Sequence, residues 1–177
     1  SQPSTTAQTV CLSFNTTPLS ITAAAGSGTI VEYKWYSNTV NSTTTGTKIL
    51  VATNTSSDTT DTYTPSSSVA GVLYYFCEVT NSNGCVTTSA VSGAITIITT
   101  SVSGTASANQ TICSGFTPSS ITLTGNTGTI QWQSSTDNST FTNMTGTGVT
   151  AATLPAATIG PLTATKYFRA VVTNTPC

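Results

Sequence analysis

The sequence predicts an all-β protein made of two copies of one module. Three observations support this prediction. The 177 residues are rich in Thr, Val, Ile and Tyr, which suit the pleated surface of a half-buried strand. Clusters of Gly, Asn, Ser and Pro recur about every ten residues, as turns between short strands require. The chain also matches itself at an offset of about 100 residues.

The internal match gives the order of the expected elements. Each copy opens with a strand that ends at a cysteine, followed by a second strand with an isoleucine and a third with a lone tryptophan. A late aromatic strand then leads to a second cysteine. The matched positions are Cys11 with Cys113, Ile21 with Ile121, Trp35 with Trp132, Tyr75 with Phe168, and Cys85 with Cys177.

These copies define two domains, residues 1–99 and residues 100–177. Repeat one continues through residues 86–98 as a last strand, whereas repeat two stops at Cys177. We therefore expect the second domain to lack its last strand here and the natural protein to continue, with the strand either outside this segment or supplied by another chain.

A central tryptophan and a late Tyr-x-Cys strand are typical of an immunoglobulin-like β-sandwich. Tyr75 and Cys77 share one face of their strand, because side chains alternate. The predicted cores therefore contain Trp35, Trp132, Tyr75 and Phe168. No cysteine lies on the second strand, so the usual disulfide between the two sheets is missing.

The repeated cysteines predict two disulfides, Cys11–Cys85 and Cys113–Cys177, if the first and last strands run side by side. Such a bond would carry tension past residues 12–84. It would also close a loop worth about 4–5 kcal/mol in the chain-entropy model. Cys77 is left as a free, buried thiol, because Ala170 fills its place in repeat two. The alternative is that Cys77 takes the place of Cys85 as the partner of Cys11.

Composition argues against several classes of function. Charged residues make up only 5% of the chain and the net charge is −1, so no basic surface is present for a nucleic acid. No apolar run is long enough for membrane insertion. Without histidine, acid–base catalysis and zinc binding have few candidate groups. We expect no catalytic residues, no cofactor and no metal.

The acidic residues leave a calcium site as a weaker alternative. Asp58, Asp61 and the pair Asp137-Asn138 are its candidates, and solvated or turn-forming side chains are the simpler interpretation. On the strand surfaces, Lys34 and Glu78 predict a cross-strand ion pair. Two further side chains, Tyr36 and Phe76, point outward in the predicted pattern and could form a flat aromatic patch for a sugar.

Three segments carry a family resemblance: residues 74–85, 130–135 and 162–174. They resemble the immunoglobulin-like repeats of very large Bacteroidota surface proteins, a family that includes the mobile adhesins of gliding bacteria exported by type IX secretion. The resemblance covers essentially the whole chain. It implies a structural or adhesive repeat of a long extracellular filament on the cell surface, with no catalytic residues to transfer.

The partners implied are neighbouring repeats of the same chain, surface polysaccharide and the secretion or motility machinery. The alternative is a spacer or carbohydrate-binding module attached to a secreted polysaccharide-degrading enzyme. Thr59, which follows Asp58, resembles the short motif that is O-glycosylated in Bacteroidota and is the expected glycosylation site.

Overall fold

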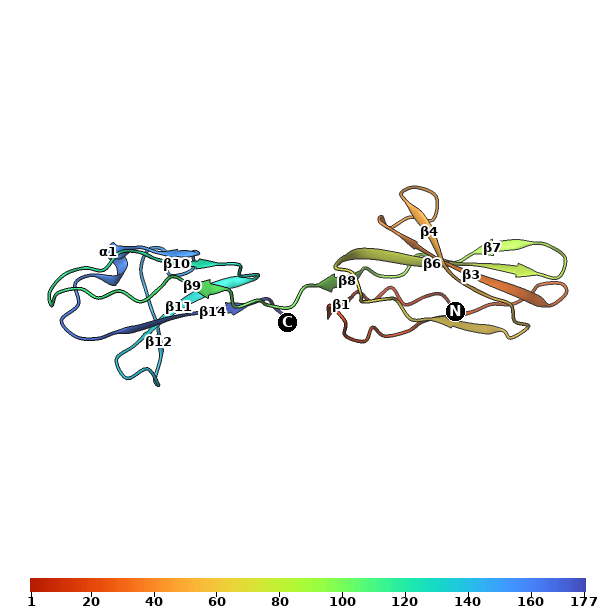
Figure 1. The fold of residues 1–177 in the computed structure, drawn as a ribbon. Helices are drawn as coiled ribbons and strands as arrows, with labels where there is room; N and C mark the ends of the chain where they lie inside the picture. Colours follow the sequence, from red (N-terminus) through yellow and green to blue (C-terminus); the bar gives the residue numbers. More distant parts are fainter. The chain divides into compact units, whose positions relative to one another are not determined.

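A computed structural model describes residues 1–177, which divide into two compact units (Figure 1). Unit 1 comprises Ser1–Ile98 together with Pro176, and unit 2 comprises Thr99–Thr175 together with Cys177. Both units are built from β-strands. No helix is long and apolar enough to cross a membrane.

Unit 1 contains eight strands in two sheets. A six-stranded sheet has the order β1-β8-β6-β3-β4, with β7 also paired to β6, and β2 pairs with β5. The strands are β1 (Gln8–Cys11), β2 (Leu19–Thr22), β3 (Ile30–Asn38), β4 (Lys48–Asn54), β5 (Thr60–Tyr63), β6 (Gly71–Asn81), β7 (Val86–Thr88) and β8 (Ile95–Ile98).

The first and last strands of unit 1 are parallel neighbours. β1 pairs with β8 from Gln8 opposite Ile95 to Cys11 opposite Ile98. Two further backbone bonds flank this register, from the Gln8 N–H to the Ala94 carbonyl (2.9 Å) and from the Leu12 N–H to the Ile98 carbonyl (2.8 Å). β8 is antiparallel to β6 on its other side, so both of its edges are satisfied.

The core of unit 1 joins the two sheets through alternating side chains. Trp35 is fully buried, and Tyr75 and Cys77 are buried on the same face of β6, as the period of two requires. The buried cluster consists of Leu19, Ile21, Ile30, Tyr33, Trp35, Tyr75, Cys77, Val79, Ile95 and Ile97. Removing these apolar side chains from water is the main force that holds the sheets together.

Unit 2 contains six strands and one short helix. Two three-stranded sheets have the orders β13-β10-β9 and β12-β11-β14. The elements are β9 (Thr105–Ala106), β10 (Ile121–Thr124), β11 (Thr129–Ser135), β12 (Thr142–Asn143), β13 (Thr153–Leu154), α1 (Ala156–Ile159) and β14 (Tyr167–Thr173).

The core of unit 2 is smaller. Its buried cluster is Leu123, Ile130, Trp132, Leu154 and Ile159. Phe168, which occupies the place of Tyr75, is only half-buried. Trp132 is fully buried and donates its indole N–H to the Ala151 carbonyl at 2.9 Å.

One side-chain clamp is common to both units. The Gln8 amide donates to the Thr17 carbonyl (3.0 Å) and accepts from the Thr17 N–H (2.7 Å). Gln110 makes the same two bonds with Ser119, at 3.1 and 2.8 Å. The repeat therefore extends from the sequence to the hydrogen bonding.

A tight turn follows this segment in both units. The Phe14 N–H donates to the Cys11 carbonyl at 3.0 Å, and the Phe116 N–H donates to the Cys113 carbonyl at 3.1 Å. The second residue after each cysteine is left-handed, with φ of 68° at Ser13 and 86° at Gly115.

The structure corrects three expectations from the sequence. The expected last strand over residues 86–98 is two strands, β7 and β8, on different stretches of β6. The predicted match of Ile21 with Ile121 is wrong by two residues. The glutamine clamps place Gln8 opposite Gln110 in the alignment, an offset of 102 residues, so the counterpart of Ile21 is Leu123. The helical turn α1 was not expected; four residues are too few to show a helical period.

Candidate functional site

The cysteines do not pair as the sequence predicted. Cys11 and Cys177 are disulfide-bonded. Cys85 and Cys113 are exposed free thiols, and Cys77 is a buried free thiol. The predicted pairs Cys11–Cys85 and Cys113–Cys177 are therefore wrong.

Topology explains why Cys11 and Cys85 cannot meet. Cys11 lies opposite Ile98 at the end of β8, beside the Gly71 end of β6. Cys85 lies in the turn after β6, where its N–H donates to the Asn81 side chain at 2.9 Å. The ten steps from Gly71 to Asn81 along β6 span about 33 Å at about 3.3 Å each. A disulfide needs Cα atoms within about 7 Å.

The same geometry separates Cys113 from Cys177 within unit 2. Cys113 precedes Phe116, which forms a bridge with Leu162 before β14 begins. Cys177 follows β14, past Thr173. The two cysteines thus lie at opposite ends of this strand, so the predicted adjacency of the first and last strands does not bring them together. The Cys11–Cys85 disulfide that was expected to carry tension past residues 12–84 does not form.

Cys77 is enclosed in the core of unit 1. Its side chain is fully buried, and burial raises the pKa of its thiol to about 12. Its N–H donates to the Ser89 hydroxyl at 2.9 Å, and the thiol donates to the Glu78 carbonyl at 3.5 Å. A protonated thiol without solvent access is a poor nucleophile, so Cys77 acts as a small apolar core residue.

Asp61 has a structural role that the sequence did not reveal. It was expected to be solvated in a loop, but it is half-buried on β5. Its carboxylate accepts the Trp35 indole N–H at 2.7 Å and the Asn54 amide at 2.9 and 3.0 Å. A carboxylate that receives these bonds anchors the central tryptophan.

Tyr36 and Phe76 do not form the exposed aromatic surface that the sequence predicted. Phe76 has no exposed surface. Tyr36 stacks on it with ring centroids 5.2 Å apart, and the Lys48 ammonium lies 5.8 Å from the Phe76 centroid. The prediction that Phe76 points into solvent is therefore wrong, and a flat surface of two exposed rings does not form.

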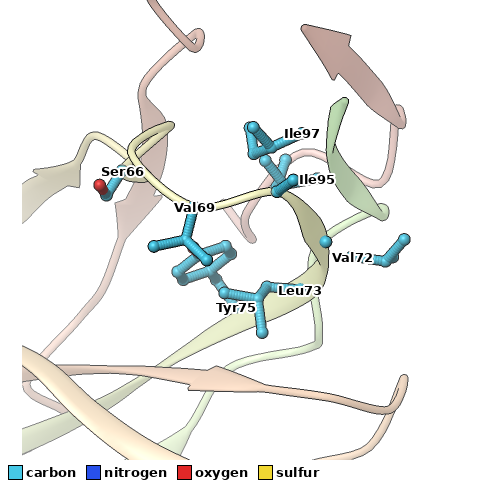
Figure 2. A pocket seen from close by; sticks show the side chains of 9 residues that line it. Ser66, Val69, Val72, Leu73, Tyr75, Ile95 and Ile97 are labelled. Carbon is cyan, nitrogen blue, oxygen red and sulfur yellow. The ribbon is translucent and has the colours of Figure 1, made fainter. Parts of the chain in front are cut away.

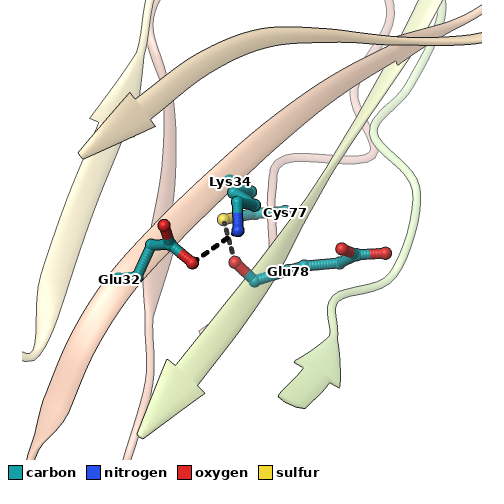
Figure 3. A network of polar contacts seen from close by, with 4 residues as sticks. All are labelled: Glu32, Lys34, Cys77 and Glu78. Atoms are coloured by element: carbon teal, nitrogen blue, oxygen red, sulfur yellow. Dashed lines mark hydrogen bonds and ion pairs between the residues drawn. The ribbon is translucent and has the colours of Figure 1, made fainter. Parts of the chain in front are cut away.

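The predicted ion pair between Lys34 and Glu78 is also replaced. Lys34 and Glu78 are opposite each other in the β3–β6 register. The Lys34 ammonium instead contacts the Glu32 carboxylate, two residues earlier on the same face, at 2.7 Å. Figure 3 shows the Glu78 carboxylate turned away from Lys34. The hydrogen bond to Glu32 raises the pKa of Lys34.

The remaining acidic candidates belong to separate turns. Asp137 accepts the N–H groups of Ser139 and Thr140, both at 2.8 Å, and the Ser135 hydroxyl at 2.7 Å. These bonds lower the pKa of Asp137. Asp58 and the expected glycosylation site Thr59 lie exposed before β5.

A small apolar cavity of about 160 Å³ opens at one end of the unit 1 core. Figure 2 shows Val69, Leu73 and Tyr75 around it, with Ile95 from β8. Binding pockets for small ligands usually measure about 300–1,000 Å³. This cavity is a packing gap rather than a ligand site, since its lining also lacks charged groups.

Comparison with known proteins finds one family. A domain of unknown function (DUF8696) matches residues 102–177. The match spans most of unit 2 and less than half of the chain. No curated protein matches the chain.

Proposed function

We propose that each unit is an immunoglobulin-like β-sandwich and that the chain is a tandem segment of a long extracellular array on a bacterial surface. In this role the units are structural or adhesive repeats that carry tension, and they are not enzymes. The proposal is supported by the repeated module itself: the same glutamine clamp, the same turn and the same buried tryptophan occur in both units.

The parallel pairing of β1 with β8 is the observation that carries the mechanical part of this proposal. A force on the two ends of unit 1 pulls β1 toward its start and β8 toward its end. Since the strands are parallel neighbours, the force acts along them and loads all their hydrogen bonds together. A pair pulled apart sideways would instead lose its bonds one at a time.

The composition of the chain supports a structural rather than a catalytic role. The chain has no histidine and five acidic residues. Asp61 holds Trp35, and Asp137 closes a turn. General acid–base catalysis needs two positioned groups with suitable pKa values, and these carboxylates do not converge on one cavity.

A sugar-binding spacer is the weaker alternative. Sugar rings are commonly recognised by exposed aromatic faces that stack on them, and here Phe76 is covered by Tyr36. Affinity electrophoresis in gels containing soluble polysaccharides provides a direct test. We expect no retardation of the chain; retardation that is lost on Tyr36→Ala would favour the alternative.

Single-molecule pulling of the whole chain tests the mechanical proposal. The experiment uses a reducing buffer, which opens the disulfide bonds of Cys11 and Cys177, so that force reaches both units. Unfolding of unit 1 releases about 300 Å of chain, at about 3.4 Å per residue. We expect Leu12→Pro to lower the force of this event, because proline removes the bond from Leu12 to Ile98.

Ser114→Pro is the matched control. Ser114 occupies the place of Leu12 in unit 2, where its N–H donates no backbone hydrogen bond. This substitution should leave the force of the unit 1 event unchanged. An equal force for Leu12→Pro and the unsubstituted chain would show that the β1–β8 pair does not carry the tension.

A further inference from the structure

Unit 2 contains a groove of about 760 Å³. Its walls are residues 106–112 and Ser114 on one side and residues 162–168 on the other, and Ile121 also lines it. The groove lies at the side of β14 that does not face β11, because β14 is the outer strand of its sheet.

The corresponding place in unit 1 is filled by β8. There β8 pairs with β1 at Gln8–Cys11 and with β6 at Gly71–Leu73. Its Ile95 and Ile97 side chains point into the core and are 1% and 5% exposed. β8 thus joins the first strand of the unit to the late aromatic strand.

The two segments that flank β8 in unit 1 both have counterparts in unit 2. The clamp between Gln110 and Ser119 matches that between Gln8 and Thr17, so residues 110–113 are the counterpart of β1. Trp132 lies opposite Ala170 as Trp35 lies opposite Cys77, which makes residues 164–166 the counterpart of Gly71–Leu73. Residues 110–112 and 164–166 all line the groove.

The backbone along the groove has unused hydrogen-bonding groups. The N–H groups of residues 108–113 and 164–166 donate no hydrogen bond within the chain. Residues 105–117 are exposed throughout, including Ile112 at 37%. Two unpaired edges that face one gap form a template for an added strand.

The side chains beneath the groove are also incompletely covered. Leu19 is fully buried in unit 1, and its counterpart Ile121 is half-buried. Tyr75 is 2% exposed, whereas Phe168 is half-buried. Both Ile121 and Phe168 line the groove, so an apolar side chain placed there would complete the core as Ile95 and Ile97 do in unit 1.

We propose that the groove of unit 2 binds a β-strand of the same kind as β8. The occupant is an extended, uncharged segment with branched aliphatic side chains two residues apart. It runs parallel to residues 110–113 and antiparallel to residues 164–166. Only a strand can satisfy both unpaired edges at once, because a helix uses its own backbone groups internally. An uncharged occupant fits this lining, because Lys166 is the one charged side chain that lines the groove.

A graft tests this proposal in the full chain. A second copy of residues 86–100 is appended directly after Cys177, the residue that ends unit 2 as Cys85 ends the aromatic segment of unit 1. Hydrogen–deuterium exchange is measured on the chain with and without the graft. We expect the amides of residues 110–113 and 164–166 to exchange at least about tenfold more slowly in the grafted chain.

The control carries the same graft with Ile95→Asp and Ile97→Asp in the appended copy only. These carboxylates would have to be buried without partners, so the control should exchange like the ungrafted chain. Equal exchange of the ungrafted and the intact grafted chain would overturn the proposal. So would an ungrafted chain that sediments as a dimer with these amides already protected, because the groove would then hold a second copy of the whole chain.

Discussion

At the scale of single residues, the central tryptophan of each unit is held in a different way. The Trp35 indole donates to the Asp61 carboxylate, whereas the Trp132 indole donates to the Ala151 carbonyl. Backbone carbonyls are available at any position, but the carboxylate depends on one side chain. Unit 1 is therefore sensitive to substitution at a position where unit 2 is not.

Asp61→Ala should destabilise unit 1 by about 1–3 kcal/mol, because it leaves the buried indole N–H and the Asn54 amide without their acceptor. Urea unfolding followed by tryptophan fluorescence measures the loss. Asp61→Asn keeps one acceptor oxygen and should lose less. The control, Asp58→Ala, changes an exposed side chain and should shift stability by no more than about 0.5 kcal/mol.

The three free thiols should differ sharply in reactivity. Burial raises the pKa of Cys77 to about 12, so at pH 8 its thiol stays protonated as well as covered. Cys85 and Cys113 are exposed. Iodoacetamide at pH 8 followed by peptide mass spectrometry should find alkylation at these two and none at Cys77 until the chain is unfolded in urea. Rapid labelling of Cys77 in the folded chain would contradict the buried placement.

At the scale of elements, the alternation of side chains predicted the strands that carry Ile21, the two tryptophans and the late aromatic residues. It did not predict β4, β5, β9, β12 or β13, and the expected first strand of the second copy, ending at Cys113, does not form because no strand pairs with it. Trp35 and Trp132 are buried on long strands, and their neighbours along each strand are half-buried on the opposite face. The cysteine pairing failed for a different reason. It depends on which strand crosses to which edge, and the crossing from β7 to β8 is fixed by contacts between residues far apart in the chain.

The two copies of the first segment provide an internal comparison of protection. Residues 8–11 form β1 and pair with β8, whereas residues 110–113 have the same clamp but no strand partner. In the unmodified chain, the Leu12 amide should exchange at least about tenfold more slowly than the Ser114 amide. Hydrogen–deuterium exchange with peptide resolution measures the ratio. Similar rates at the two positions would mean that β8 contributes little to protecting β1.

At the scale of the whole molecule, the two units differ in the completeness of their cores. Unit 1 buries Tyr75, Cys77 and Val79 on one face of β6. The counterparts on β14, Phe168, Ala170 and Val172, are only half-buried. The stability of a domain rises with the apolar area it removes from water, so the repeats should not be equally stable. The internal repeat was visible in the sequence, but this inequality was not.

We expect unit 2 to unfold first. Exchange measured over a urea series should show peptides from unit 2 losing protection at a concentration lower by about 1 M or more than peptides from unit 1. No substitution is needed, because each peptide reports on its own unit. Loss of protection in both units at one concentration would show that they unfold as a single cooperative body.

The turn that follows each first cysteine has a consequence for sequence change between repeats. Ser13 and Gly115 adopt the same left-handed backbone, yet serine reaches it at a cost of about 1 kcal/mol that glycine avoids. The geometry is common to the two copies, whereas the residue that adopts it differs. Duplicated modules of this type thus accumulate small backbone penalties in individual copies, and a consensus drawn from many copies would remove them.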